Sequence, residues 1–180
     1  LRRVRLTLMD GAHRSTGWDR FAAGSALEHL ALTWGAHHDR AATGELRSHL
    51  GQLLGSFGSL QQIVVDQLDT PTFPPQLAKH TGLTFLSWRT GGLTSLAGIQ
   101  ALPELRTVSV SGNSVTDLTP VSALLGLETF YAQDNAIVDV SPLSLCANLR
   151  TVDLASNPIE RALGLGFLPN LETLILKDTQ

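Results

Sequence analysis

The C-terminal half of the chain repeats at a constant interval, with units that begin at Leu83, Leu105, Leu127, Leu149 and Leu171. A period of about 22 residues is typical of a solenoid, in which each repeat forms one coil that cannot bury its apolar side alone. We therefore expect a stack of coils around one shared core. Four stretches align without a gap, and the fifth is cut off: LTFLSWRTGGL, LRTVSVSGNSV, LETFYAQDNAI and LRTVDLASNPI.

The apolar residues recur at the same positions in every full unit. If the first leucine is position 1, then positions 1, 4, 6, 11, 14, 17 and 20 are apolar throughout. The spacing from 4 to 6 is that of a β-strand, and the later spacing of three suits a tight 3₁₀ or α turn. These positions predict the core: Leu83, Leu86, Trp88, Leu93, Leu96, Ile99 and Leu102; Leu105, Val108, Val110, Val115, Leu118, Val121 and Leu124; Leu127, Phe130, Ala132, Ile137, Val140, Leu143 and Cys146; Leu149, Val152, Leu154, Ile159, Ala162, Leu165 and Leu168.

Position 9 carries Gly91 in the first unit and an asparagine in the next three. An asparagine amide offers an acceptor and two N–H donors, and a buried backbone group left unpaired costs about 1–3 kcal/mol. We expect each amide to satisfy turn backbone groups of its own coil and of the next. The sequence thus predicts a structural asparagine ladder of Asn113, Asn135 and Asn157.

These residues resemble the leucine-rich repeat pattern LxxLxLxxNxL. The segments DLTPVSALLGL from Asp117 and DVSPLSLCANL from Asp139 are similar to the 22-residue subclass found in internalins. The resemblance implies an α/β fold, a right-handed horseshoe-shaped solenoid. Its concave side would carry a parallel β-sheet, and its convex side would carry short helices or 3₁₀ turns.

The resemblance is strong over residues 83–180 and continues more weakly upstream. Coils that open at Leu1, Leu27 and Leu60 are longer than the regular unit, and Leu68 stands where asparagine belongs. We therefore expect one leucine-rich-repeat domain over 1–180, with irregular repeats in 1–82 and regular ones in 83–180. It would hold about seven full coils and a partial eighth.

The outer segments of the upstream coils have helical patterns. GELRSHLGQLLGSF from Gly44 places Leu46, Leu50, Leu53 and Leu54 on one stripe, and a shorter segment begins at Pro74. Neither end of the chain carries a polar capping unit, which solenoids need for solubility. We therefore expect the chain to be a fragment of a larger protein.

Composition limits the classes of partner. The formal net charge is −3, which argues against nucleic acid. No apolar run reaches the length of a membrane span, which argues against a membrane partner. The single cysteine, Cys146, excludes a disulfide framework and favours a reducing compartment, so we expect a cytoplasmic protein, with a secreted or surface location as the alternative.

The sequence carries no motif of a catalytic or cofactor site. The phosphate-binding loop GxxxxGK[ST], GxGxxG, the GxSxG elbow and HExxH are all missing. His37, His38 and Asp39 are adjacent but lack a second ligand cluster, so we interpret them as a solvated loop. Cys146 occupies an apolar inward position, where a thiolate is disfavoured. We predict no enzymatic activity, no metal site and no cofactor in this chain.

Side chains at positions 3, 5, 7 and 8 are expected to point to the concave face, where the core does not need them. Trp, Tyr and Arg are the residue types that most often anchor protein interfaces, whereas the threonine column at position 3 suits strand formation. A rival location is the insertion between Gly35 and Ser59. The predicted contact residues on the concave face are Phe85, Arg89, Tyr131, Gln133, Asp134 and Asp153.

The resemblance implies a protein-binding or ligand-sensing module of a larger multidomain protein. Its partners would be a protein ligand and other domains of the same parent chain. One hypothesis is the sensor or autoinhibitory region of a bacterial NACHT-type antiphage defence NTPase. The alternatives are an internalin-like adhesin or secreted effector that binds a host protein, and the substrate-recognition or regulatory domain of an enzyme.

Overall fold

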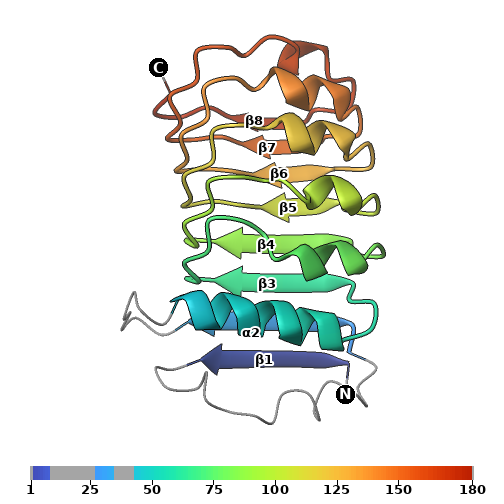
Figure 1. The fold of residues 1–180 in the computed structure, drawn as a ribbon. Coiled ribbons are helices and arrows are strands. Elements are labelled where there is room, and N and C mark those ends of the chain that lie inside the picture. Colours follow the sequence, from blue (N-terminus) through green and yellow to red (C-terminus); the bar gives the residue numbers. More distant parts are fainter. Residues whose placement is uncertain (1, 9–26, 35–42, 180) are drawn as a thin grey trace.

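The computed structural model describes residues 2–8, 27–34 and 43–179. Eight strands form one parallel sheet in which the spatial order equals the chain order (Figure 1). The strands are β1 Arg3–Leu8, β2 His29–Trp34, β3 Gln62–Asp66, β4 Phe85–Arg89, β5 Thr107–Ser109, β6 Thr129–Tyr131, β7 Thr151–Asp153 and β8 Thr173–Ile175.

The strand register confirms the coil starts predicted for the irregular half. Arg3 pairs with His29, His29 with Gln62, and Gln62 with Phe85, so position 3 of each coil lies beside position 3 of the next. The same alignment continues through Thr107 and the later coils. Coils of unequal length therefore keep one strand frame.

The helices and 3₁₀ turns all lie on one side of the sheet, and the coils wind right-handed (Figure 1). A crossover between parallel strands is right-handed almost without exception. The predicted solenoid fold, with its parallel sheet and short outer turns, is confirmed. The outer elements are α2 Thr43–Ser56, η3 Pro75–Lys79, η4 Ile99–Ala101, η5 Thr119–Ala123, η6 Ser141–Leu145 and η7 Leu165–Phe167.

One continuous apolar core extends along the stack from Leu27 to Leu168. Trp88 is its largest fully buried side chain, and Phe73 meets it edge-on with ring centroids 5.3 Å apart. The Trp88 indole N–H donates to Thr70 Oγ1 at 3.1 Å, which satisfies its one polar atom. Burial of each such side chain stabilises the fold by about 2 kcal/mol.

One predicted core position is wrong. Ala162 is exposed, whereas position 14 is buried as leucine or valine in the three preceding units. An alanine methyl group gains little from burial. The backbone N–H of Arg161 instead donates to Val138 O, and the chain then turns at Gly164 with φ of 93°.

Aspartates begin the 3₁₀ turns of the two middle units. The carboxylate of Asp117 accepts the Thr119 backbone N–H at 2.8 Å, and that of Asp139 accepts the Ser141 N–H at 2.9 Å. The bonds from Ser141, more than the nearby Arg161 guanidinium, hold the pKa of Asp139 below its ordinary value. The aspartates of the DLTP and DVSP motifs thus form Asx turns just before η5 and η6.

Position 8 has a left-handed backbone in six successive coils. Gln67, Thr90, Asp134, Ser156 and Asp178 have φ between 49° and 60°, and Gly112 has φ of 70°. A Cβ on Gly112 would also lie 2.8 Å from Thr90 Cγ2, so glycine suits this coil sterically. The left-handed residue ends each strand and turns the chain toward the convex side.

The asparagine amides join each coil to the preceding one. Asn135 Nδ2 donates to Val110 O and Ala132 O, both at 3.0 Å, and its Oδ1 accepts the Val115 N–H at 3.0 Å. Asn113 and Asn157 make equivalent bonds. The partners lie in the asparagine's own coil and in the coil before it, not in the next coil as the sequence suggested.

Position 2 carries alternating charges along the stack. Arg106 Nη1 lies 3.8 Å from Glu128 Oε1, and Arg150 Nη1 lies 2.6 Å from Glu172 Oε1. All four side chains are about half exposed, so each pair contributes only about 0–1 kcal/mol. The alternation keeps like charges from lying side by side on consecutive coils.

A buried histidine links the long helix to the coil that follows. The His80 ring accepts the Leu60 N–H through Nδ1 at 3.2 Å, and its Nε2 lies 3.1 Å from Leu54 O. These partners require the neutral tautomer that is protonated on Nε2. Burial lowers the pKa of His80 below its ordinary value of 6.5.

Replacing a ladder asparagine should destabilise the stack. Asn135→Ala leaves the Val110, Ala132 and Gln133 carbonyls and the Val115 N–H without this partner, so we expect a loss of about 2–4 kcal/mol in urea unfolding. The exposed Asn148 donates only to Leu125 O, so Asn148→Ala is the matched control, with an expected loss below about 1 kcal/mol. Equal losses in the two variants would contradict a ladder role.

The stability of the fold should depend on the neutral state of His80. Because the folded pKa is depressed, the unfolded chain takes up a proton first as the pH falls below about 6.5, and stability declines by up to about 1.4 kcal/mol per pH unit until the folded pKa is reached. His80→Leu should be less stable than wild type at pH 8, yet its stability should fall less between pH 7 and 5. Urea unfolding across this range measures both curves, and parallel curves would contradict the assignment.

Candidate binding face on the sheet

The side of the sheet opposite the helices carries positions 3, 5 and 7 of each coil, and we call it the concave face. Every helix and 3₁₀ turn that the structure describes lies on the other side (Figure 1). Successive coils bring equivalent positions together, so Ser109, Tyr131 and Asp153 are neighbours on adjacent strands. The concave face is therefore built from residues that lie one full coil apart in sequence.

A hydrogen-bonded polar row crosses the middle of this face. Ser111 Oγ donates to Gln133 Oε1, and Gln133 Nε2 donates to Asp153 Oδ2 at 2.9 Å. The other carboxylate oxygen of Asp153 accepts the backbone N–H of Ala155 at 3.1 Å. The row holds the Asp153 carboxylate in place beside Tyr131, a half-buried aromatic ring.

The structure brings together four of the six predicted contact residues. Tyr131, Gln133 and Asp134 belong to one coil, and Asp153 is on the next strand. Phe85 and Arg89 lie on β4, separated from Tyr131 by β5. Phe85 is half-buried and Arg89 is exposed, so both remain accessible beside the cluster.

Position 8 was predicted to point to the concave face, but in the regular coils it lies in the turn after the strand. In a regular strand, consecutive side chains point to opposite faces, so positions 7 and 8 cannot both face one way. Here Asp134 follows the strand and has φ of 55°, which breaks the alternation. Asp134 is an exposed turn residue at the end of the strand rather than a strand residue of the concave face.

The charges of this cluster have no ion-pair partners within the described ranges. Neither Arg89 nor Asp134 nor Asp153 forms a salt bridge there, although the charges of position 2 are paired. At the C-terminal end, Lys177 and Asp178 lie 4.0 Å apart. The face therefore presents Arg89, with Asp66 beside it in the strand register, and Asp153, with Asp134 at the end of β6. None of these four charged groups forms an ion pair within the described ranges.

Two polar contributors were missed by the reasoning from sequence. Ser111 orients Gln133, and Thr90 Oγ1 donates to Asp66 Oδ1 at 2.9 Å in the preceding pair of coils. A search for aromatic and charged residue types passes over serine and threonine. The sequence feature that could have identified Ser111 is its repeat position, because Ser111 and Gln133 both hold position 7 of successive coils.

Some predictions lie outside the described residues. These are the interpretation of His37, His38 and Asp39 as a loop, and residues 35–42 of the predicted insertion. The rest of the insertion contains α2, whose predicted stripe residues Leu50, Leu53 and Leu54 are buried.

The only cysteine is not activated. Cys146 is fully buried, its Sγ lies 3.4 Å from Val121 O, and burial raises the pKa of its thiol to about 11. Among the described residues, no group of three or more His, Cys, Asp or Glu side chains could hold a metal ion. None of the described helices is long and apolar enough to cross a membrane.

Comparison with known proteins gives structural neighbours only. No family model matches the chain, and no curated protein matches it. Solved structures that share its fold include an internalin (InlF) from Listeria monocytogenes, with 23% identity and a TM-score of 0.69 over 90% of this chain and 45% of that one. Internalin C2 from the same organism has 19% identity and a TM-score of 0.70, covering 91% of this chain and 66% of that one.

A leucine-rich-repeat protein from Leptospira interrogans, LIC12759, has 19% identity and a TM-score of 0.60 over 86% of this chain and 44% of that one. The chain thus spans less than two thirds of the length of each of these neighbours. The protein is a leucine-rich-repeat solenoid by fold, and two of its structural neighbours are internalins.

Cys146 should resist thiol reagents until the stack unfolds. At pH 8, a thiol with a pKa of about 11 is roughly 0.1% thiolate, against roughly a quarter for an ordinary thiol, so we expect labelling at least about a hundredfold slower than in urea-unfolded chain. Because the sequence has one cysteine, mass spectrometry reads the rate directly. Equally fast labelling of folded and unfolded protein would contradict the buried position.

Proposed function

We propose that this chain is a protein-binding module and that its ligand contacts the centre of the concave face. The contact residues are Phe85, Arg89, Tyr131, Gln133, Asp134 and Asp153, as predicted from the sequence. The observation that carries the proposal is the set of charges without ion-pair partners around a half-buried tyrosine, within the described part of the chain.

The energetics of the face favour this location. Charged side chains that are already paired within a protein gain little from a partner, whereas unpaired ones gain a new interaction. The strand register places Tyr131 between Ser109 and Asp153, and its side chain is half-buried. A half-buried aromatic ring beside hydrogen-bonded polar groups is typical of a binding hot spot.

The size and charge of the cluster suit one structural element of the ligand. From β4 to β7 the patch spans three strand spacings, about 14 Å, which fits a single helix or loop. We infer that this element places a basic side chain near Asp134 and Asp153 and an acidic one near Arg89. Electrostatic complementarity of this kind sets specificity and the association rate more than affinity.

The finer hypotheses differ in support. The three structural neighbours do not support a NACHT-type defence role or a cytoplasmic location. They share the fold with this chain at low identity, 23%, 19% and 19%, so they do not favour the internalin-like alternative over a protein-binding module of another kind. We propose a binding role rather than a catalytic one, with other domains of a longer parent protein as further candidate partners.

Site-specific photo-crosslinking tests the proposal. A photoreactive phenylalanine analogue at Tyr131 should capture the ligand, whereas the same analogue at Leu125, an exposed residue that follows η5 and lies outside the strands, should not. With the captured protein purified, Tyr131→Ala and Asp153→Asn should each weaken the affinity by about tenfold, or about 1.4 kcal/mol.

Leu125→Ala is the control, because it also removes an accessible apolar side chain, and it should leave the affinity within about twofold. Capture at Leu125 but not at Tyr131, or an affinity that all three variants leave unchanged, would overturn the concave-face proposal. Calorimetry or biolayer interferometry supplies the dissociation constants.

A further inference from the structure

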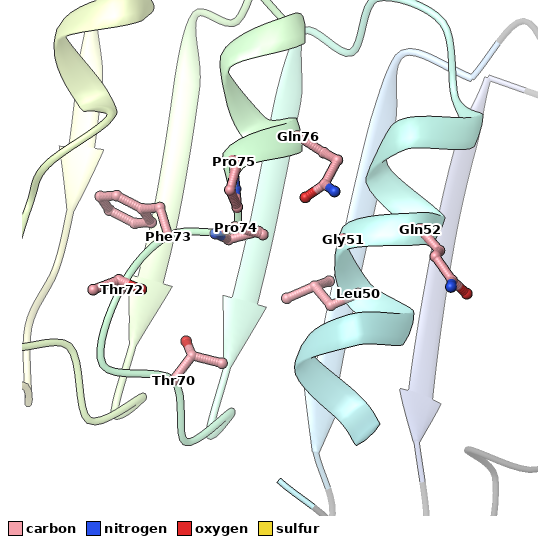
Figure 2. A pocket seen from close by; sticks show the side chains of 9 residues that line it. All are labelled: Leu50, Gly51, Gln52, Thr70, Thr72, Phe73, Pro74, Pro75 and Gln76. Atoms are coloured by element: carbon pink, nitrogen blue, oxygen red, sulfur yellow. The ribbon is translucent and has the colours of Figure 1, made fainter. Parts of the chain in front are cut away.

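A second candidate site lies on the convex side, between α2 and the segment that leads into η3. Figure 2 shows this cleft, with Leu50 of α2 facing Phe73 and Pro74 and with Gln76 extending between the two elements. Its volume is about 380 Å³, near the lower end of the range of ligand-binding sites.

The cleft follows from a mismatch between neighbouring coils. α2 has 14 residues, whereas η3 has 5 and a narrower 3₁₀ geometry, so the two cannot stack evenly. They are tied at one end, where Lys79 Nζ donates to Gly55 O and His80 contacts Leu54 O. At the other end, beside Leu50 and Phe73, the elements separate and leave the cleft open.

The lining combines an apolar wall with neutral hydrogen-bonding groups. Leu50, Phe73 and Pro74 form the wall, and no lining residue is charged. Gln76 makes no side-chain hydrogen bond to a described residue, and a Cβ on Gly51 would lie 2.7 Å from its Oε1. Glycine at position 51 therefore leaves the space that this amide occupies.

A buried hydroxyl in the lining has an unused donor. Thr70 is 1% exposed, and its Oγ1 accepts the Trp88 indole N–H at 3.1 Å. Within the described ranges no acceptor takes the Thr70 hydroxyl proton. A buried donor without an acceptor costs free energy, which a ligand carbonyl in the cleft would recover.

We propose that this cleft binds an uncharged peptide segment. One leucine-sized apolar side chain of the peptide packs on Leu50, Phe73 and Pro74, and a peptide carbonyl accepts the Thr70 hydroxyl proton. The Gln76 amide, which has both donors and an acceptor, pairs with the adjacent peptide group. The neutral lining disfavours a charged ligand, because it offers no opposite charge to offset desolvation.

The test uses N-acetyl-leucine methylamide as the probe and the indole N–H signal of Trp88 as the readout. In ¹H–¹⁵N spectra of the full chain, this signal is the one of three indole peaks that Trp88→Phe removes. We expect a saturable shift with a dissociation constant of about 1–10 mM, as for a small fragment. N-acetyl-alanine methylamide and zwitterionic leucine should bind at least about fivefold more weakly.

Matched glutamine variants locate the binding. Gln76→Ala should weaken probe binding by about threefold to tenfold, because a ligand hydrogen bond is lost. Gln62→Ala is the control, since Gln62 is an exposed glutamine at position 3 of its coil, in β3, on the opposite side of the sheet, and does not line the cleft. Thr70→Val should also weaken binding, but it removes the acceptor of the Trp88 indole as well, so the result with exposed Gln76 decides the test.

The proposal would be overturned if the Trp88 indole signal did not shift at 50 mM probe, a concentration at least about five times the expected dissociation constant. An equal response to zwitterionic leucine, or equal effects of the two glutamine variants, would also overturn it. Tyr131→Ala lies on the opposite side of the sheet and should leave probe binding unchanged. The cleft proposal and the concave-face proposal can therefore fail independently.

Discussion

The burial of apolar side chains between successive coils is the interaction on which the rest of the structure depends. Phe130 has no water contact because Val108 and Val152 lie beside it on the adjacent strands. A coil alone would expose the same side chains, and each would lose about 2 kcal/mol of stabilisation. Stacking also sets the distance between neighbouring coils, and with it the hydrogen bonds and ion pairs that they form. The asparagine ladder and the concave face both follow from this distance.

Close stacking creates a polar requirement, because each tight turn buries backbone groups next to the core. Different side chains satisfy these backbone groups at different places along the stack. Asn135 and its equivalents join neighbouring turns in the regular coils, and Asp139 forms an Asx turn just before η6. His80 satisfies the end of α2 at the junction of the irregular and regular halves. Loss of Asn135 or His80 leaves more than one backbone group without its partner, whereas loss of the Asp139 carboxylate leaves one.

The apolar positions of the repeat could be predicted from the sequence, because burial of apolar side chains alone determines them and they recur at a fixed spacing. Ala162 is the predicted core position that departs from this rule, although Ala132 at position 6 follows it. The direction of the asparagine bonds, the Gln133–Asp153 contact and the left-handed Asp134 could not be predicted in the same way. Each depends on how the side chains and turns of two neighbouring coils are oriented. The repeat period shows which coils are in contact but not how their side chains point.

The cleft beside Leu50 has the same origin in unequal coils, and a regular repeat could not have produced it. A uniform stack buries equivalent turns against one another, so a concavity on the convex side needs a change in the width of the outer element. This chain makes that change once within the part that the structure describes, from α2 to η3. The regular coils give an extended face on the sheet, whereas the irregular junction supplies a small open cleft, so the two candidate sites suit ligands of different size.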